Sequence, residues 1–267
     1  MIKRFMVQSL RGLGIDNSLR SLWYRAFGGW IRRTISFDGR SYSFRCPIPM
    51  LSDSVGSMNK ERQAVEWFLS RIDPGCVVWD VGANVGLWTL ITARRVGPTG
   101  KVVAFEPFAE AMTLLRANLR DNGLSNVVLR PEALGQRDGE ADFFRAKKTV
   151  LSTSSLSYRS GKFGTDSTPI HVPLRSGASV AEHDPDLLPD AVKIDVEGAE
   201  QAVLEGFSAP IWRKLRTIAI EVHPDFLPSL GGSMEQVKRL IQDHGFRIVA
   251  ESSRRDTLHW LCVKNEA

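Results

Sequence analysis

The chain has 267 residues, of which 43% are hydrophobic and 24% charged, with a formal net charge of +5. These values exclude a disordered or low-complexity chain. No apolar run reaches the roughly 20 residues of a membrane-spanning helix, and MIKRFMVQSLRG lacks the apolar segment of a secretory signal, so we expect a cytoplasmic protein. The three cysteines are odd in number and without CxxC, which indicates neither a disulfide framework nor a zinc site.

The first 60 residues concentrate the positive charge. They carry ten Lys or Arg and three Asp, a net charge of +7, and aromatic residues are interleaved with arginines in LWYRAFGGWIRR. Such a segment could pack on the main domain, or it could contact an anionic membrane surface, a lipid-linked substrate or an acidic polymer. We expect a basic N-terminal extension over residues 1–60, with a helix within the first 33 residues and a hairpin around Asp38 and Gly39.

Residues 61–267 alternate between helix and strand patterns. KERQAVEWFLSRIDPG predicts a helix that stops at Pro74 and Gly75, and strand-like CVVWDVGA follows. The alternation then runs through GLWTLITARRVG, KVVAFEP, AEAMTLLRANLRDNG and NVVLRPEA. It resumes after residue 190 with AVKIDVEG, EQAVLEGF, TIAIEVHP, SMEQVKRLIQDHG, RIVAES and TLHWLCV. The alternation predicts an α/β fold with a doubly wound, mostly parallel sheet.

Residues 135–190 interrupt this alternation. Two short strand candidates, ADFFRA and IHVPLR, flank the Ser/Thr/Gly-rich segment STSSLSYRSGKFGTDSTP. Loops of this size in compact domains are usually functional or mobile. We therefore predict an insertion on the substrate side of the domain.

The strands of the predicted sheet end in or near carboxylates. Because the carboxyl ends of parallel strands lie along one edge, where ligands bind at the switch point of strand order, we expect these acids to line one crevice. In chain order they are Asp80, Glu106, Glu132, Asp195 with Glu197, and Glu221.

The segment VVWDVGANVG is typical of a nucleotide-containing cofactor site. Gly82 and Gly86 allow a tight turn with a close backbone approach, and Glu106 is placed to accept hydrogen bonds from a ribose. Asn84 stands where a dinucleotide fingerprint needs glycine, and Asp80 suits the ammonium and sulfonium groups of S-adenosylmethionine better than a pyrophosphate. Phe108 is a candidate for packing on adenine. The candidate cofactor-binding residues are Asp80, Gly82, Ala83, Asn84, Gly86, Glu106, Phe108, Glu132, Ala133 and Asp195.

Five segments together resemble the FkbM family of S-adenosylmethionine-dependent methyltransferases. They are VVWDVGANVGLWTL, VVAFEPFAEAMTLLRANL, PEALGQRDG, AVKIDVEGAEQAVLEGF and TIAIEVHP. The resemblance runs from about Glu61 to Val222 and implies a class I methyltransferase fold, which is Rossmann-like and has a seven-stranded sheet with a reversed final hairpin. It also implies O-methylation of a hydroxyl on a sugar, a glycan or a related natural product.

The fourth and fifth strands supply the candidate catalytic residues. Methyl transfer to an aliphatic hydroxyl requires alignment and proton removal, by a base or with a divalent cation that stabilises the alkoxide. Asp195 and Glu197 are expected to share one strand face, and Glu221 and His223 to share a face of the neighbouring strand. We predict His223 as the base, with a pKa near the operating pH. Asp195 and Glu221 are expected to orient the acceptor or, with His223, to bind Mg²⁺ or Mn²⁺.

Other polar residues near these motifs are interpreted as structural. Lys193 is expected to be buried and paired with nearby carboxylates. Glu200 is interpreted as an acid in the first turn of a helix, where the dipole favours it. No partner spacing assigns a role to His171, His183, His244 and His259.

Two alternative functions remain open. The basic N-terminus and a pI of about 9.3 would suit a nucleic-acid methyltransferase, but DVEG offers neither the (N/D)PP(Y/F) tip nor the Pro-Cys nucleophile of base-modifying enzymes. An NAD-dependent oxidoreductase is the other alternative, which Asn84 and Asp80 disfavour. We therefore predict an O-methyltransferase for a small-molecule or glycan acceptor, located in the cytoplasm or at the inner face of the membrane, with no prediction of its oligomeric state.

Overall fold

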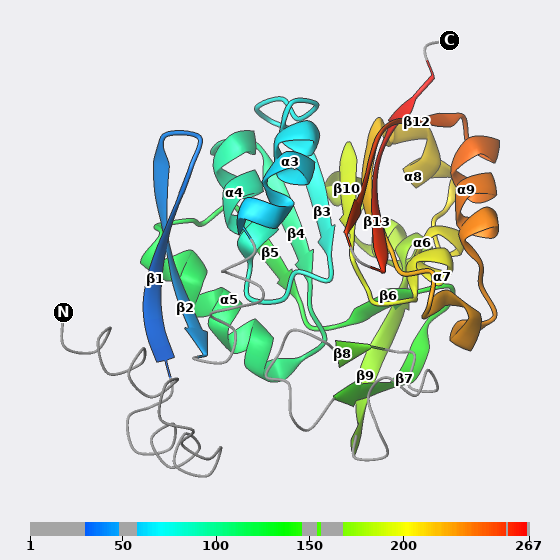
Figure 1. Ribbon diagram of the computed structural model, residues 1–267, viewed down its shortest axis with the longest axis horizontal. Coiled ribbons are helices and arrows are strands. Elements are labelled where there is room, and N and C mark those ends of the chain that lie inside the picture. The colour runs from blue at the N-terminus through cyan, green and yellow to red at the C-terminus, as the bar shows by residue number, and fades with distance from the viewer. Residues whose placement is uncertain (1–29, 48–57, 146–153, 156–167, 255, 266–267) are drawn as a thin grey trace.

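A seven-stranded sheet forms the centre of the protein in this computed structural model (Figure 1), with the strand order β12-β13-β11-β10-β3-β4-β5. β13 runs antiparallel to both neighbours, whereas the other neighbouring strands are parallel. This confirms the predicted doubly wound α/β fold with a reversed final hairpin. The structure describes residues 30–47, 58–145, 154–155, 168–254 and 256–265. The strands of this sheet are β3 (Val77–Val81), β4 (Lys101–Phe105), β5 (Val127–Arg130), β10 (Ala191–Ile194), β11 (Thr217–Val222), β12 (Phe246–Arg254) and β13 (Thr257–Lys264).

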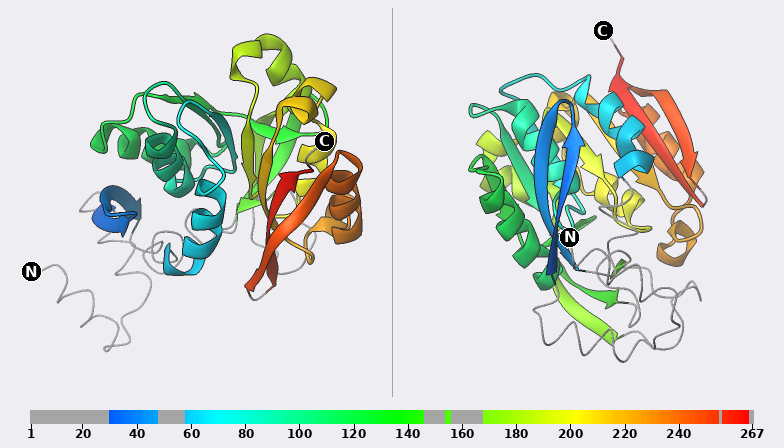
Figure 2. Two further views of the ribbon diagram at one scale, coloured as in Figure 1. Left: turned by 90° about the horizontal axis from the view of Figure 1, so that it is seen from above. Right: turned by 60° about the vertical axis from the view of Figure 1, so that its left-hand side comes forward.

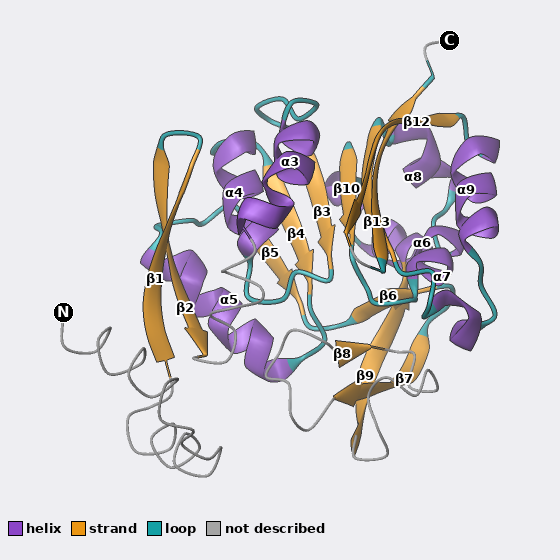
Figure 3. Ribbon diagram, viewed as in Figure 1, coloured by secondary structure: helices purple, strands orange, loops and turns teal. Residues whose placement is uncertain are grey.

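Helices cover both faces of this sheet, as Figures 2 and 3 show. Because strand side chains alternate, Val78 and Val102 join the core under α3, α4 and α5, whereas Trp79 and Val103 join the core under α6 to α9. Two covered faces explain the nearly continuous apolar strands VVWDV and TIAIEV. The helices are α3 (Met58–Leu69), α4 (Leu87–Val96), α5 (Ala109–Asp121), α6 (Gly177–His183), α7 (Glu200–Glu205), α8 (Ala209–Lys214) and α9 (Met234–Asp243).

Two details of the helices differ from the prediction. α3 ends at Leu69, before the predicted stop at Pro74 and Gly75, because the chain tightens into turns that bury Ile72 at 1% exposure. Proline also disfavours helical geometry in the residue that precedes it. The short helices α6 and α8 are not among the predicted elements. α6 lies within residues 135–190, where an insertion was predicted, and no separate pattern was assigned to the residues of α8.

The predicted N-terminal hairpin is present as β1 (Trp30–Phe37) and β2 (Arg40–Pro47). Asp38 and Gly39 join the strands with φ angles of 49° and 67°, the positive values that a tight hairpin turn requires. Because β1 begins at Trp30, the helix predicted within the first 33 residues cannot include residues 30–33. The rest of that helix prediction lies outside the described residues.

The hairpin packs on the main domain, whereas most of the segment LWYRAFGGWIRR, for which packing was predicted, lies outside the described residues. Tyr42 and Phe44 are 2% and 0% exposed. Arg45 donates from Nε to Asp121 Oδ2 at 2.6 Å, and Arg32 Nη2 lies 3.0 Å from the same oxygen, so two of the basic residues hold the hairpin on α5. Residues 1–29 lie outside the described residues, and a contact with membrane or lipid stays a prediction.

The segment predicted as an insertion forms a second, four-stranded sheet with the order β6-β9-β7-β8. It lies beyond the carboxyl ends of β3 and β4 (Figures 1 and 2), which is the side where a ligand of the central sheet would bind. Within the described residues, no helix has the length and apolar character needed to cross a membrane. The strands of the second sheet are β6 (Ala133–Gly135), β7 (Gly139–Arg145), β8 (Ser154–Ser155) and β9 (Thr168–Ser176), and a short 3-10 helix, η3 (Pro185–Leu187), follows α6.

Candidate active site

The loops after β3 and β10 pack against each other at the switch point of the strand order. β3 and β10 are adjacent and parallel, and the sheet continues to β4 on one side and to β11 on the other. Gly82 has a φ of 80°, and a Cβ added there would lie 1.9 Å from the carbonyl oxygen of Asp195. Only glycine allows this backbone contact, which joins the glycine loop to the segment DVEG.

Gly82→Ala is expected to lower the free energy of unfolding by about 2 to 4 kcal/mol and to weaken cofactor binding, because steric overlap adds to the positive φ. Urea unfolding and calorimetric titration with S-adenosylhomocysteine measure both effects. Gly123→Ala is the matched control, since Gly123 has a φ of 65° and open space at its Cβ, and it should lose only about 1 kcal/mol. Equal losses in the two variants would contradict the packing argument.

Glu106 stabilises the glycine loop from the end of β4. Its Oε2 accepts a hydrogen bond from the amide of Asn84 at 2.8 Å, and its Oε1 accepts one from the amide of Phe108 at 2.9 Å. Burial raises the pKa of Glu106 to about 7, although both amide hydrogen bonds lower it. A carboxylate has further lone pairs, so a role in binding ribose hydroxyls stays compatible with these contacts.

Three predicted cofactor residues occupy less favourable positions. Phe108 is 3% exposed and packs in the core shared by α4 and α5, which argues against a contact with adenine. Ala133 is buried in β6 of the second sheet. Glu132 precedes that strand, and its Oε1 lies 3.9 Å from Nη1 of Arg130. Glu132 and Ala133 therefore lie where the two sheets meet.

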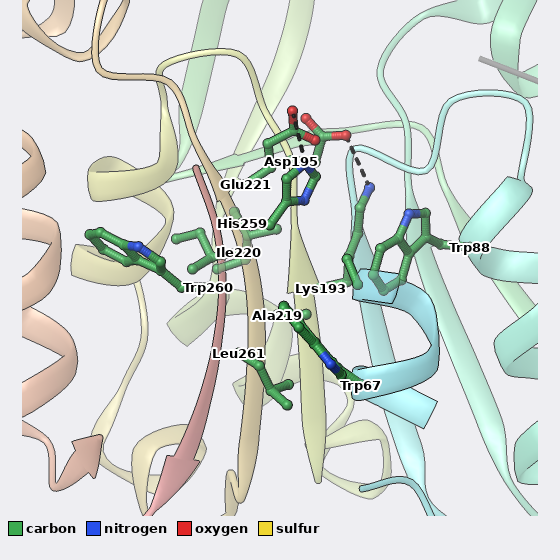
Figure 4. Close-up of a pocket in the computed structure, with 12 residues that line it drawn as sticks. Trp67, Trp88, Lys193, Asp195, Ala219, Ile220, Glu221, His259, Trp260 and Leu261 are labelled. Carbon is green, nitrogen blue, oxygen red and sulfur yellow. Dashed lines mark ion pairs between the residues drawn. The ribbon is translucent and has the colours of Figure 1, made fainter. Parts of the chain in front are cut away.

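Lys193 binds the glycine loop to the fourth strand. Its ammonium lies 3.8 Å from Asp195 Oδ2 (Figure 4). It also lies 3.2 Å from Asp80 Oδ1 and donates a hydrogen bond to the carbonyl of Gly82 at 2.8 Å. Burial lowers the pKa of Lys193, but the charges of Asp80 and Asp195 outweigh this effect and raise the pKa above its ordinary value. The side chain is therefore a paired cation, as predicted.

Asp80 differs from its predicted role. It is 1% exposed, and besides Lys193 it contacts Thr89, whose hydroxyl donates to Asp80 Oδ2 at 2.5 Å. Both carboxylate oxygens thus face protein groups. Asp80 stabilises the glycine loop from within β3 and does not present a free carboxylate to the ammonium or sulfonium of a cofactor.

His223, directly after β11, is surrounded by carboxylates. Its Nε2 lies 3.5 Å from Glu197 Oε2, 3.9 Å from Glu221 Oε1 and 4.0 Å from Asp195 Oδ1. On the other side of the ring, Nδ1 lies 2.8 Å from Glu200 Oε1. The convergence predicted for the fourth and fifth strands is therefore present, with His223 at its centre.

The prediction that Asp195 and Glu197 share one face of a strand is wrong, because both residues lie beyond the end of β10. β10 ends at Ile194, and Glu197 has a φ of 52° in the left-handed region, followed by Gly198 at 107°. A non-glycine residue in this region is uncommon, and strained residues of this kind cluster at active sites. This turn, and not the alternation of a strand, places Glu197 near His223.

Glu200 and His259 contact the residues of this site, although the sequence analysis interpreted Glu200 as structural and assigned no role to His259. Glu200 is 0% exposed and accepts from the amide of Gly198 at 2.8 Å as well as contacting His223. His259 is the cross-strand partner of Glu221 in β13, with Nε2 3.5 Å from Glu221 Oε1. The antiparallel pairing of the last strand is the signal that could have identified His259. The other histidines lie elsewhere, as predicted.

A small cavity under the cluster limits where an acceptor can lie. Figure 4 shows Lys193, Asp195, Glu221 and His259 grouped at one end of it. Its volume of about 20 Å³ is enough for about one water molecule and not for a sugar. A ligand of that size has access to the cluster from its open side, where 33% of the Asp195 side chain is accessible.

The charge of His223 differs from the prediction of a base with a pKa near the operating pH. Burial lowers the pKa of His223, but the hydrogen bond with Glu200 and the charges of Glu197, Glu200 and Asp195 together raise it to about 10. His223 is therefore an imidazolium at neutral pH. Burial also raises the pKa of Glu197 and that of Glu221 toward neutral pH.

Glu200→Gln is expected to lower the pKa of His223 by at least about 1 unit, equivalent to about 1.4 kcal/mol, because it removes the closest negative charge. The folded pKa of about 10 lies above the ordinary value of 6.5, so this stabilisation is complete below pH 6.5 and is lost as the pH rises toward 10. NMR titration of the imidazole measures the shift. Glu205→Gln, an exposed change on the same helix, is the control, and an unchanged pKa in Glu200→Gln would contradict the assignment.

Three of these side chains could bind a metal ion. Oxygen atoms of Asp195 and Glu197 and a ring nitrogen of His223 all lie within 4.8 Å of one another. Carboxylate oxygens with one imidazole fit Mn²⁺ or Mg²⁺. Glu221, which the sequence suggested as a ligand, is not in this group and contacts His259 instead. The structure thus favours Glu197 as the second carboxylate ligand.

Comparison with known proteins assigns the chain to a family. Residues 80–248, more than half of the chain, match the Methyltransferase FkbM domain. The chain belongs to the FkbM methyltransferase family. The matched residues include the glycine loop, Glu200 and the carboxylates around His223, whereas His259 lies beyond them.

Relatives in the FkbM family carry different names. The chain is 29% identical to 31-O-demethyl-FK506 methyltransferase FkbM of Streptomyces tacrolimicus, over 68% of this chain and 76% of that protein. It is 30% identical to methyltransferase sdnD of Sordaria araneosa, over 68% of this chain and 75% of that protein. It is 23% identical to hexuronic acid methyltransferase AglP of Haloferax volcanii, over 75% of this chain and 79% of that protein.

Proposed function

We propose that this FkbM-family protein is an S-adenosylmethionine-dependent O-methyltransferase that acts on a hydroxyl of a sugar, a glycan or a related natural product. The observation that carries the proposal is the meeting of Asp195, Glu197 and Glu221 around His223, directly beside the glycine loop at the switch point. A cofactor held by the glycine loop would present its methyl group to an acceptor held by the acidic cluster.

The names of two relatives support an oxygen acceptor. One refers to a 31-O-demethyl compound and the other to a hexuronic acid. The acidic cluster supports the same conclusion, because carboxylates bind hydroxyl groups as hydrogen-bond acceptors. A hydroxyl-rich acceptor that carries its own carboxylate would have to keep that group away from the cluster.

The residues of this site have distinct roles in the proposed transfer. The acceptor oxygen attacks the methyl carbon in line, the carbon–sulfur bond breaks, and the hydroxyl proton passes to a carboxylate. Asp195, the most accessible carboxylate, orients the hydroxyl. Glu197 is the proton acceptor, since burial brings its pKa to about 7, near the pH of the reaction. The His223 imidazolium attracts the carboxylates near its Nε2, and Glu200 fixes the ring through its contact with Nδ1.

A divalent cation would be held by Asp195, Glu197 and His223. Bound there, it would supply a Lewis acid that stabilises the developing alkoxide. His223 would have to lose its proton to become a ligand, because metals bind the neutral imidazole. The buried carboxyl of Glu200 would then accept the hydrogen bond from Nδ1, the arrangement typical of metal-bound histidines.

The test is transfer of a labelled methyl group from S-adenosylmethionine to a panel of sugars, hexuronic acids and glycans, with and without a chelator. We expect transfer to at least one hydroxyl, which mass spectrometry would locate on oxygen. Calorimetric titration with S-adenosylhomocysteine measures the cofactor site separately. Absence of its binding by every method would overturn the proposal, whereas binding without transfer would point to a different acceptor.

The two alternatives are distinguished in the same experiments. Membership of a methyltransferase family favours methyl transfer over an NAD-dependent oxidation. A nucleic-acid acceptor would show binding that falls steeply with salt. Contact of the basic N-terminal extension with a lipid-linked substrate at the inner face of the membrane remains part of the proposal and is tested by binding to anionic vesicles.

A further inference from the structure

A second cavity has a lining that shares no residue with the cavity at the acidic cluster, although α3 contributes to both. It is open to solvent and is lined by the hairpin β1–β2, by α3 with the turn that follows, and by α4. Its volume is about 580 Å³, within the range of roughly 300 to 1,000 Å³ typical of small-molecule sites. None of the residues that line it belongs to the candidate active site.

The walls of this cavity carry an excess of positive charge. Four arginines and two acids line it, a net charge of +2. Its floor is apolar and rigid, because Phe37, Tyr42 and Ile91 are buried in the core. A basic rim over an apolar floor is suited to an organic anion. The charged lining residues are Arg40, Arg62, Arg94, Arg95, Asp38 and Glu66.

Contacts with the protein fix three of these arginines and leave donors available. The guanidinium carbon of Arg62 lies 5.3 Å from the centre of the Phe37 ring, and that of Arg94 lies 4.7 Å from the centre of the Tyr42 ring. Arg95 Nε donates to the carbonyl of Ile72 at 2.7 Å. Each guanidinium has five N–H donors, so these contacts orient the groups without using all of their donors.

Arg40 differs from the other arginines of the cavity. Within the described part of the chain its side chain makes no hydrogen bond and no ion pair, although it stands at the start of β2 beside the cavity. An arginine that has no partner among the described residues and stands at the rim of a basic cavity is available to a ligand. It can also be replaced with little consequence for folding.

We propose that this cavity is a second binding site for a phosphate-bearing ligand. Guanidinium groups bind phosphate oxygens in pairs of parallel hydrogen bonds, and a phosphate monoester with a charge near −2 balances the net charge of the walls. The apolar floor takes the organic part of the ligand. The phosphate could belong to a soluble ester or to a lipid headgroup, and both share this chemistry.

The experiment is an NMR titration of the full-length protein with inorganic phosphate at constant ionic strength, followed on the arginine Nε–H signals. We expect saturable shifts in the wild type and an affinity at least about tenfold weaker in the double variant Arg40→Gln/Arg95→Gln. Arg71→Gln is the matched control, because Arg71 follows α3 but does not line the cavity. Its affinity should stay within about twofold of the wild type, as screening predicts for a charge outside the site.

Two vesicle preparations distinguish the possible sources of the phosphate. Binding is measured by sedimentation with phosphatidylcholine vesicles that contain either phosphatidic acid or phosphatidylserine at equal surface charge. If only the binding to phosphatidic acid vesicles depends on Arg40 and Arg95, the ligand is a lipid headgroup. If inorganic phosphate shifts the arginine Nε–H signals but the variants bind both kinds of vesicle as the wild type does, the ligand is a soluble ester. The proposal would be overturned by a phosphate titration that does not saturate. It would also be overturned if Arg71→Gln weakened the affinity for phosphate as much as the double variant does. Unchanged binding of S-adenosylhomocysteine by the variants separates this outcome from the proposed function.

Discussion

Asp195→Asn is expected to lower kcat by about 10²- to 10⁴-fold while the affinity for S-adenosylhomocysteine stays within a few fold of the wild type. Asp195 is the most accessible carboxylate of the cluster, 33% exposed against 20% for Glu197 and 14% for Glu221. Asparagine keeps the shape of the side chain but carries no charge, so it orients the acceptor hydroxyl poorly for proton transfer to Glu197. Single-turnover transfer of a labelled methyl group measures the chemical step.

The control for this variant removes the same charge elsewhere. Asp186 is exposed on the 3-10 helix η3, away from the cluster, and Asp186→Asn should keep the full kcat. Full activity in Asp195→Asn would exclude this carboxylate from the reaction. A large loss of S-adenosylhomocysteine binding in the same variant would instead assign Asp195 to the cofactor, which was the other role expected for it.

Lys193→Met should lower the free energy of unfolding by about 3 to 5 kcal/mol, the cost of leaving a buried charge without its partner. Asp80 is 1% exposed, and its ion pair with Lys193 spans 3.2 Å. The same ammonium holds the carbonyl of Gly82, so cofactor affinity should fall as well. Urea unfolding and calorimetric titration measure the two effects.

A double variant separates the ion pair from the packing of the lysine stem. Asp80→Asn combined with Lys193→Met removes both charges, and it should be more stable than Lys193→Met alone, with a coupling energy of about 1 to 3 kcal/mol in the double-mutant cycle. A loss below about 1 kcal/mol in the single variant would mean that the pair contributes little to the folded state.

Asp195 connects the two halves of the proposed site. On one side Lys193 lies 3.8 Å away and holds the glycine loop, and on the other side His223 lies 4.0 Å away at the centre of the acidic cluster. The two cations compensate the charge of a carboxylate that remains partly open to solvent. A change at Lys193 should therefore affect cofactor affinity and turnover together, whereas a change at Glu200 should affect turnover alone.

The sequence was sufficient for the alternation of the central strands with the longer helices and for the meeting of Asp195, Glu221 and His223. Strand and helix periods are local properties, and parallel strands place their carboxyl ends along one edge, so Asp195, Glu221 and His223 could be expected to meet. The glycine loop is equally local, because a turn with positive φ requires particular residues. Family resemblance supplied the seven strands and the reversed final hairpin, whereas the order of the strands in the sheet comes from the structure.

Only the tertiary structure decided how the site is charged and completed. Glu197 reaches His223 through a left-handed turn, Glu200 through a buried helix start, and His259 through the pairing of β13 with β11. The pKa of His223 rises to about 10 because carboxylates from separate segments surround it. Periodicity determines which side of an element a residue faces. Distances and burial depend on chain segments that are far apart in sequence, and these set the charge of His223 and the partners of Asp80.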